Sequence, residues 1–187
     1  MSAKVSQHVA RKDYPNFGVA KGDTYYGWSL PMGGTFRAYK SKTMPKPRQL
    51  TTSEFQISRL DLEDRINALS TDMSFDDIRS EVESIAEDIK SLGEEQTEKF
   101  DNMPEGLQSG PSGELLEGRA SACEEWAEGL EEVDTDGDDD DIRNEYCESL
   151  GEPRELTDED EESIAANIED RKREIINEIQ ACSYNGD

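Results

Sequence analysis

The sequence has little of what most catalytic centres need. Its 187 residues include one histidine, His8, and three cysteines with no Cys-x-x-Cys pair. One histidine cannot supply both a general base and a set of metal ligands, and no nucleophile, base and orienting group can be assembled around it. The glycines of "PMGG" (31–34) are not followed by the Lys-Ser/Thr of a phosphate-binding loop. We therefore expect a protein without catalytic activity, cofactor or zinc site.

Long apolar runs are absent as well. No stretch approaches eighteen apolar residues and no signal peptide is recognised, so we expect no membrane association. Cys123, Cys147 and Cys182 are odd in number and widely spaced, a pattern typical of reduced thiols in a cytoplasm. Cys123 and Cys182 fall in apolar helical positions, which favours a role as small core residues.

Positive charge is scarce and unevenly distributed. The chain carries 20 Lys and Arg against 45 Asp and Glu, a net charge of −25. Residues 1–50 have a net charge of +7, whereas residues 51–187 have a net charge of −32. Such asymmetry points to binding driven by charge, and the partner of the long acidic part should be basic.

Three segments are predicted along the chain. Residues 1–50 hold seven of the thirteen aromatic residues, and "GDTYYGWSL" and "TFRAYKSK" flank "PMGG", which predicts a basic β-hairpin. Residues 51–133 show apolar positions repeating in steps of four and three, first over 78–92 and then over 116–130, separated by the helix-breaking "DNMPEGLQSGPSG". Residues 134–187 predict an acidic loop and C-terminal helices, a short one around 142–150 and a last one capped through Thr157 and Asp160. The expected fold is mainly α, a helical hairpin or coiled-coil bundle with a small N-terminal β-hairpin.

The acidic surface is the first candidate site. Between residues 124 and 162 there are twenty carboxylates and two arginines, many of them on predicted helices. A helix rises about 1.5 Å per residue, close to the roughly 1.7 Å of axis per charge in duplex DNA. We expect this surface to bind a basic, nucleic-acid-handling enzyme as a DNA mimic and to inhibit it. The predicted contact residues are Glu124, Glu125, Glu128, Glu131, Glu132, Asp134, Asp136, Asp138, Asp139, Asp140, Asp141, Asp158, Glu159, Asp160, Glu161 and Glu162.

A calcium loop is an alternative interpretation of the aspartate run at 134–141. Asp134, Asp136, Asp138 and Glu145 occupy loop positions 1, 3, 5 and 12, which supply oxygen ligands in an EF-hand. Position 6, which needs glycine for its sharp turn, is Asp139 instead. A run so rich in carboxylates meets two or three ligand positions in almost any frame, so the pattern favours no specific metal site.

The basic aromatic segment supports a second function, nucleic-acid binding. Cations that meet phosphates, next to rings that stack on bases, form a platform for single strands. Because side chains alternate along a strand, Tyr26 and Trp28 are expected on one face. The acidic helices would then act as an oligomerisation stalk or an autoinhibitor. The candidate residues are Tyr26, Trp28, Arg37, Tyr39, Lys40, Lys42, Lys46 and Arg48. A third possibility is a structural coiled-coil assembly protein, in which the heptads hold a homodimer together.

Three segments of the sequence resemble an uncharacterised protein family of bacteriophages and prophages. They are "KGDTYYGW", "SKTMPKPRQLTTSEF" and "DNMPEGLQSGPSGELLEGRA", and the resemblance covers roughly residues 9–133. It implies no catalytic residues and no known activity. It does imply a setting, the cytoplasm of a bacterial host cell, where the partner of an acidic phage protein would be a host nucleic-acid enzyme or a defence complex.

Overall fold

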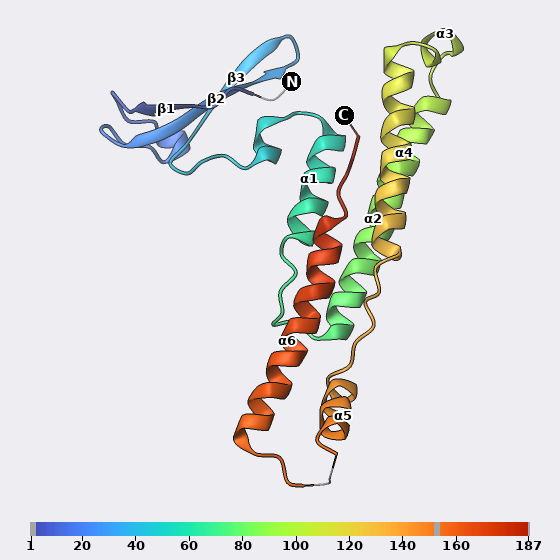
Figure 1. The fold of residues 1–187 in the computed structure, drawn as a ribbon. Helices are drawn as coiled ribbons and strands as arrows, with labels where there is room; N and C mark the ends of the chain where they lie inside the picture. The colour runs from blue at the N-terminus through green and yellow to red at the C-terminus, as the bar shows by residue number, and fades with distance from the viewer. Residues whose placement is uncertain (1–2, 152–153, 187) are drawn as a thin grey trace. The chain divides into compact units, whose positions relative to one another are not determined.

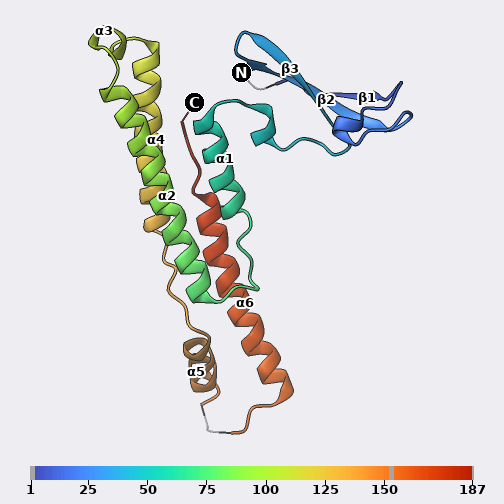
Figure 2. The same cartoon turned by 180° about the vertical axis from the view of Figure 1, so that it is seen from behind.

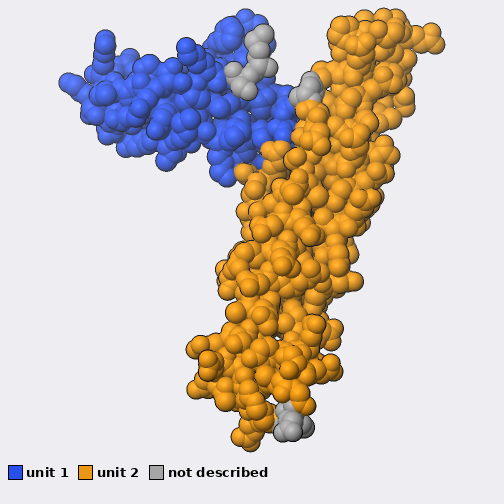
Figure 3. Space-filling model, in the orientation of Figure 1, with its two compact units in different colours: residues 1–61 blue, residues 62–187 orange. Residues whose placement is uncertain are grey.

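The structure is a computed structural model that describes residues 3–151 and 154–186. Within these residues the chain forms six α-helices and one three-stranded antiparallel sheet (Figure 1). The prediction of a mainly helical protein with a small N-terminal β element is thus confirmed. The chain divides into two compact units, residues 1–61 and residues 62–187, which Figure 3 colours separately.

The sheet of the first unit has the order β1-β2-β3, with β1 at Ser6–Val9, β2 at Thr24–Met32 and β3 at Thr35–Ser41. The predicted two-stranded hairpin is β2–β3, and its loop is Gly33-Gly34 with φ of 56° and 84°. Both glycines adopt the left-handed conformation that a two-residue hairpin loop requires. The prediction was wrong in the number of strands, because β1 also pairs with β2. The four residues "SQHV" are too short and too polar to show a strand pattern.

The remaining elements of the first unit are short. They are the 3₁₀ turns η1 at Pro15–Phe17 and η2 at Pro47–Leu50, and the start of helix α1 at Glu54–Ile66. One cluster of buried side chains consists of Ala10, Val19 and Tyr25, with the half-buried Tyr14 packed against it. The loop between β1 and β2 therefore folds back over one end of the sheet.

The second unit is built around two long helices, α2 at Phe75–Asp101 and α4 at Pro111–Glu131, joined through the short α3 at Glu105–Gln108. The two helices lie side by side in both views (Figures 1 and 2). Residues of both predicted apolar stripes are buried, since Ile85 and Ile89 of α2 and Cys123 and Ala127 of α4 have no exposed surface. Gly93 allows the close approach, because a Cβ added there would lie 3.0 Å from Cys123 Cβ.

Two further helices complete this unit, α5 at Asp139–Ser149 and α6 at Asp158–Ala181. The sequence predicts a short helix at 142–150, but α5 begins three residues earlier, inside the aspartate run. Helix α6 begins at the predicted cap: the Thr157 side chain accepts from Asp160 N, and the Asp160 side chain accepts from Thr157 N. At its other end the Cys182 thiol donates to Gly129 O at 3.3 Å, which holds the end of α6 next to α4.

Candidate interaction surfaces

The sixteen predicted acidic contact residues occupy three different places in the second unit. The first group lies on α4 and at its C-cap, the second in the loop before α5 and in the first turn of α5, and the third in the first five residues of α6. Fifteen of the sixteen are exposed and Asp160 is buried. In order along the chain, the three groups are residues 124–132, residues 134–141 and residues 158–162.

Many of these carboxylates stabilise the start of a helix. The Asp138 side chain caps α5 by accepting from the backbone N–H groups of Asp140 and Asp141, at 2.8 and 3.1 Å. Asp139 to Asp141 form the first turn of α5, as Asp158 to Glu161 do in α6. Negative charge is favourable there because unpaired N–H groups and the helix dipole both point toward it. Part of the acidity therefore has a local structural explanation.

The loop at 134–138 is fastened to the neighbouring helices by ion pairs. Asp134 pairs with Arg171 of α6 at 3.3 Å, and Asp136 pairs with Arg79 of α2 at 3.4 Å. Gly137 packs against Phe75 so closely that a Cβ would lie 2.4 Å from the ring. A polar cleft of about 850 Å³ opens beside this loop, with both arginines in its lining. The loop is thus held against helices α2 and α6 and leads into α5.

The four residues of the calcium interpretation are not arranged as a metal site. The Asp134 carboxylate accepts from Asp136 N, and Asp138 is the cap of α5. Glu145 lies within α5, at a position of an exposed helix face. Among the residues that the structure describes, no group of three or more His, Cys, Asp or Glu side chains could hold a metal ion.

Asp160 is the centre of a hydrogen-bond network at the start of α6. Its carboxylate accepts two bonds from Arg154 at 2.7 Å, one from the Thr157 hydroxyl at 2.6 Å and one from Tyr146 at 3.2 Å. These donors, Arg154 first and Thr157 next, hold the pKa of the Asp160 carboxyl far below its ordinary value. Asp160 is therefore committed to internal contacts. Glu161 is also engaged, in an ion pair with Arg143 of α5.

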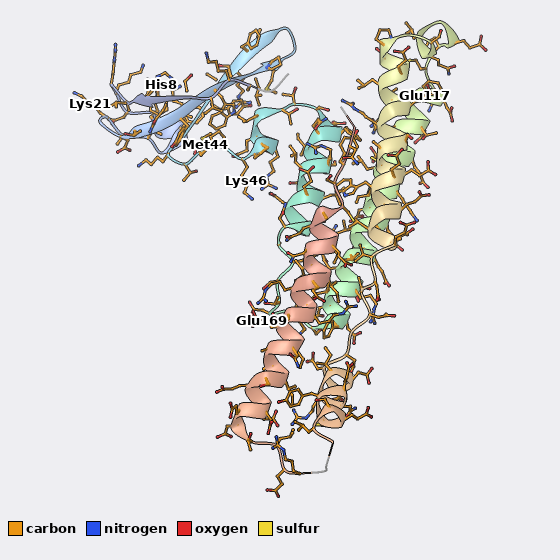
Figure 4. All side chains as sticks on the ribbon, in the orientation of Figure 1. His8, Lys21, Met44, Lys46, Glu117 and Glu169 are labelled. Carbon is orange, nitrogen blue, oxygen red and sulfur yellow. The ribbon has the colours of Figure 1, made fainter. Side chains whose placement is uncertain are left out.

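Between α2 and α4 lies a groove of about 740 Å³, and its lining is rich in exposed carboxylates. Among the described residues that line the groove, Lys90 is the one with a basic side chain, and it donates to Glu131 at 2.6 Å. This hydrogen bond raises the pKa of Lys90. We call these groups the groove carboxylates; Figure 4 labels one of them, Glu117. They are Glu94 and Asp101 of α2, and Glu117, Glu124, Glu128 and Glu131 of α4.

The sheet of the first unit has two faces with different environments. Residues paired across antiparallel strands lie on one face, so Trp28 and its partner Tyr39 share a face with Leu30 and Arg37. Trp28 and Leu30 are buried, the Trp28 ring stacks on Tyr39 with centroids 5.7 Å apart, and Trp28 Nε1 donates to Gln49 O at 3.0 Å. We call this the covered face. Tyr26 also belongs to it and is half-buried.

The lysines and arginines predicted to bind nucleic acid lie in different local environments of this unit. Lys42 pairs with Asp23 at 2.8 Å, and Arg48 pairs with Asp61. The Arg37 guanidinium lies over the Tyr39 ring, 5.6 Å from its centroid. The backbone N–H of Lys46 donates to the Gln49 side chain at 2.8 Å. Lys40 lies on the opposite side of the sheet from Arg37, since neighbouring side chains of a strand alternate.

The opposite side, which we call the open face, comprises Ser6, His8, Tyr25, Gly27, Ser29, Pro31, Phe36, Ala38 and Lys40. At one end of this face Tyr25 is buried against the loop between β1 and β2. A depression of about 390 Å³ lies over it, and Lys4 is part of the lining. His8, labelled in Figure 4, and Phe36 are exposed, the latter at 78%. His8 and Lys4 are not among the residues predicted from the sequence, because β1 was not expected and so its alignment with β2 was not considered.

Comparisons with known protein families, with curated proteins and with solved structures found no match. In residues 3–151 and 154–186, no helix is long and apolar enough to cross a membrane.

Proposed function

We propose that the second unit is a non-catalytic inhibitor module that binds the basic nucleic-acid groove of an enzyme through its groove carboxylates. The observation that supports it is the placement of six exposed carboxylates along one groove between two packed helices, where Lys90 is the accompanying cation. Side chains on a packed helix keep their spacing, so the unfavourable self-repulsion of this array is maintained in the free protein. A basic partner relieves that repulsion.

The spacing along α4 suits a partner that normally binds phosphates. Glu117, Glu124, Glu128 and Glu131 are separated by seven, four and three residues, so they lie on one stripe of the helix. At about 1.5 Å per residue the stripe is roughly 21 Å long. Its closer members, Glu124, Glu128 and Glu131, are then about 6 and 4.5 Å apart along the axis. Each strand of duplex DNA carries one phosphate per roughly 3.4 Å of axis. Over the whole stripe the carboxylates are on average about 7 Å apart, close to the roughly 6.8 Å between every second phosphate.

This groove replaces the broader acidic surface of the sequence analysis as the centre of the proposed interface. Asp134, Asp136, Asp160 and Glu161 have partners inside the molecule, whereas Glu124 and Glu128 face the groove. The resemblance to phage proteins suggests where the partner is found, among nucleic-acid enzymes or defence complexes of a bacterial host. Inhibition follows because the carboxylates would occupy the positions of the phosphates.

The test compares two triple charge reversals. In the first, Glu117, Glu124 and Glu128 are changed to Lys. In the control, Glu83, Glu87 and Glu98, which are exposed on α2 and lie outside the groove lining, are changed to Lys. Each tagged protein is mixed with nuclease-treated bacterial lysate, and the captured proteins are then offered duplex DNA as a competitor. We expect the wild type and the control to capture a DNA-displaceable enzyme and the groove variant to lose it. Equal capture by both variants would contradict the proposal.

Self-assembly through the heptad stripes is the third function that the sequence suggested. In the structure the stripe residues Ile85, Ile89, Cys123 and Ala127 have no exposed surface within one chain. A homodimer would therefore need to use a different surface, or to open the α2–α4 contact. A coiled-coil dimer stays a prediction, and sedimentation of the purified protein measures it.

A further inference from the structure

The open face combines a flat, small-residue floor with aromatic and basic edges. Gly27, Ser29 and Ala38 meet at its middle, where β2 and β3 pair Gly27 with Lys40 and Ser29 with Ala38. Because Ser29 and Ala38 have small side chains, a planar group can approach the backbone of the sheet there. At Gly27 the rings of His8 and Tyr25 border this floor, 3.4 and 3.5 Å from the position of an added Cβ. Phe36 borders the floor at one end, with 78% of its surface exposed.

The other edge of the open face carries positive charge that is held in place. Lys40 Nζ lies 4.5 Å from the centroid of the Tyr14 ring and 5.3 Å from that of Phe17. Cation–π contacts of this kind restrict the long lysine side chain and leave its ammonium group available for hydrogen bonds to an anion. Lys4 lines the same depression, and Arg11 lines the adjoining one together with His8, Val9, Tyr14 and Tyr25.

Contact between water and the exposed ring of Phe36 is unfavourable, so burial of the ring against a flat partner lowers the free energy. The adjacent cations specify that the flat partner also carries negative charge. A base with its phosphate meets both requirements, whereas an acidic peptide supplies charge without a ring that would stack on Phe36 and the small-residue floor. Duplex DNA is a poorer fit, because its bases are already stacked on one another.

We propose that the open face of the first unit is a binding site for single-stranded nucleic acid, with a base stacked on Phe36 and phosphates bound by Lys40 and Lys4. The site lies on a different unit from the groove carboxylates and does not depend on the function proposed for them. It also differs from the nucleic-acid surface predicted from the sequence, since Trp28 and Tyr39 pack on the covered face.

The experiment compares substitutions on the two opposite faces of strand β3. Binding of the full-length protein to a short fluorescein-labelled oligothymidylate is measured by anisotropy at low salt. The open-face variant carries Phe36→Ala with Lys40→Gln, and the control carries Arg37→Gln, which removes the same charge from the covered side. We expect the open-face variant to bind about tenfold more weakly or worse, and the control to stay within about threefold of wild type. Affinity should fall as salt is raised.

Three outcomes would overturn the proposal. They are no binding of the wild type, equal weakening by the open-face and control variants, and equal affinity for a duplex of the same length. The second outcome would mean that net charge, and not the open face, holds the oligonucleotide. The triple reversal of Glu117, Glu124 and Glu128 serves as a further check. It should lose enzyme capture and still bind the oligonucleotide. The two proposals can therefore fail independently of each other.

Discussion

Arg154 and Asp160 form a two-bond ion pair at the start of α6, in which both terminal nitrogens of the guanidinium donate to the carboxylate, each at 2.7 Å. The pair places a buried aspartate inside one of the most acidic stretches of the chain. Two parallel bonds of this kind are short and directional, so they specify the position of both groups. The negative charge of Asp160 is consequently used to order the α5–α6 region, and it is not available to a partner.

Replacing Asp160 with Asn should destabilise the protein by several degrees in Tm, because the amide cannot accept all of the bonds from Arg154, Thr157 and Tyr146. The pKa of Asp160 is lowered in the folded state, so its stabilising effect is present above the ordinary aspartate pKa of about 3.9 and is lost as the pH falls toward the folded value. Thermal unfolding measured by circular dichroism should therefore give a difference in Tm between wild type and variant that is constant near neutral pH. That difference should shrink below about pH 4.

Glu162→Gln is the matched control for this change. Glu162 is an exposed carboxylate of the same helix, and its neutralisation should leave Tm nearly unchanged. A Tm loss of the same size in both variants would mean that the total charge of this segment, and not the Arg154–Asp160 pair, sets the stability.

Substitution of Gly93 tests the close contact between α2 and α4. Gly93→Val should destabilise the protein by about 1–3 kcal/mol more than Gly118→Val, because overpacking displaces helices that already touch. A Cβ at Gly93 lies 3.0 Å from Cys123 Cβ, whereas nothing lies within 4 Å of a Cβ at Gly118 in α4. The two substitutions change helix propensity equally, so their difference in urea unfolding isolates the packing effect. Equal free energies of unfolding would show that α2 and α4 are not in close contact at Gly93.

The three thiols should react with a disulfide reagent in the order of their exposure. Cys147 is exposed, Cys182 is partly buried and Cys123 is buried. Burial, followed by the nearby charges of Glu178 and Glu132, raises the pKa of Cys182, so less of it is thiolate at a given pH. Mass spectrometry of the modified peptides should find Cys147 labelled first and Cys123 labelled only in denaturant. Labelling of Cys182 as fast as Cys147 in the native protein would place the end of α6 away from Gly129.

The helices were the easiest part of the fold to predict. The steps of four and three over 78–92 coincide with buried residues of α2, and the Thr157 cap marks the first turn of α6. Over 116–130 the agreement is partial, because Leu116 and Ala120 are only half-buried. The start of α5 was predicted too late, because the aspartate run was interpreted as loop. Asp138 caps this helix, and the three aspartates after it occupy the first turn, where acidic residues are favourable.

The sheet was predicted less completely, for a physical reason. Strand β1 has four residues, and its pairing with β2 joins segments separated by the whole of residues 10–23. Trp28 was predicted as a residue that stacks on bases, yet its ring lies against Tyr39 and its Nε1 bonds to Gln49 O, twenty-one residues away. The two-residue loop of the hairpin places Tyr39 opposite Trp28, whereas Gln49 lies outside the hairpin and cannot be identified from the local pattern.

The sequence by itself determined the segregation of charge, the helical content and most of the helix positions, since capping and apolar periodicity act over a few neighbouring residues. The tertiary structure decided which face of the sheet stays open and which carboxylates have internal partners. Those outcomes depend on contacts between distant residues, such as Asp134 with Arg171 and Asp136 with Arg79. Composition shows how many charges the chain carries, but packing decides which of them a partner can reach.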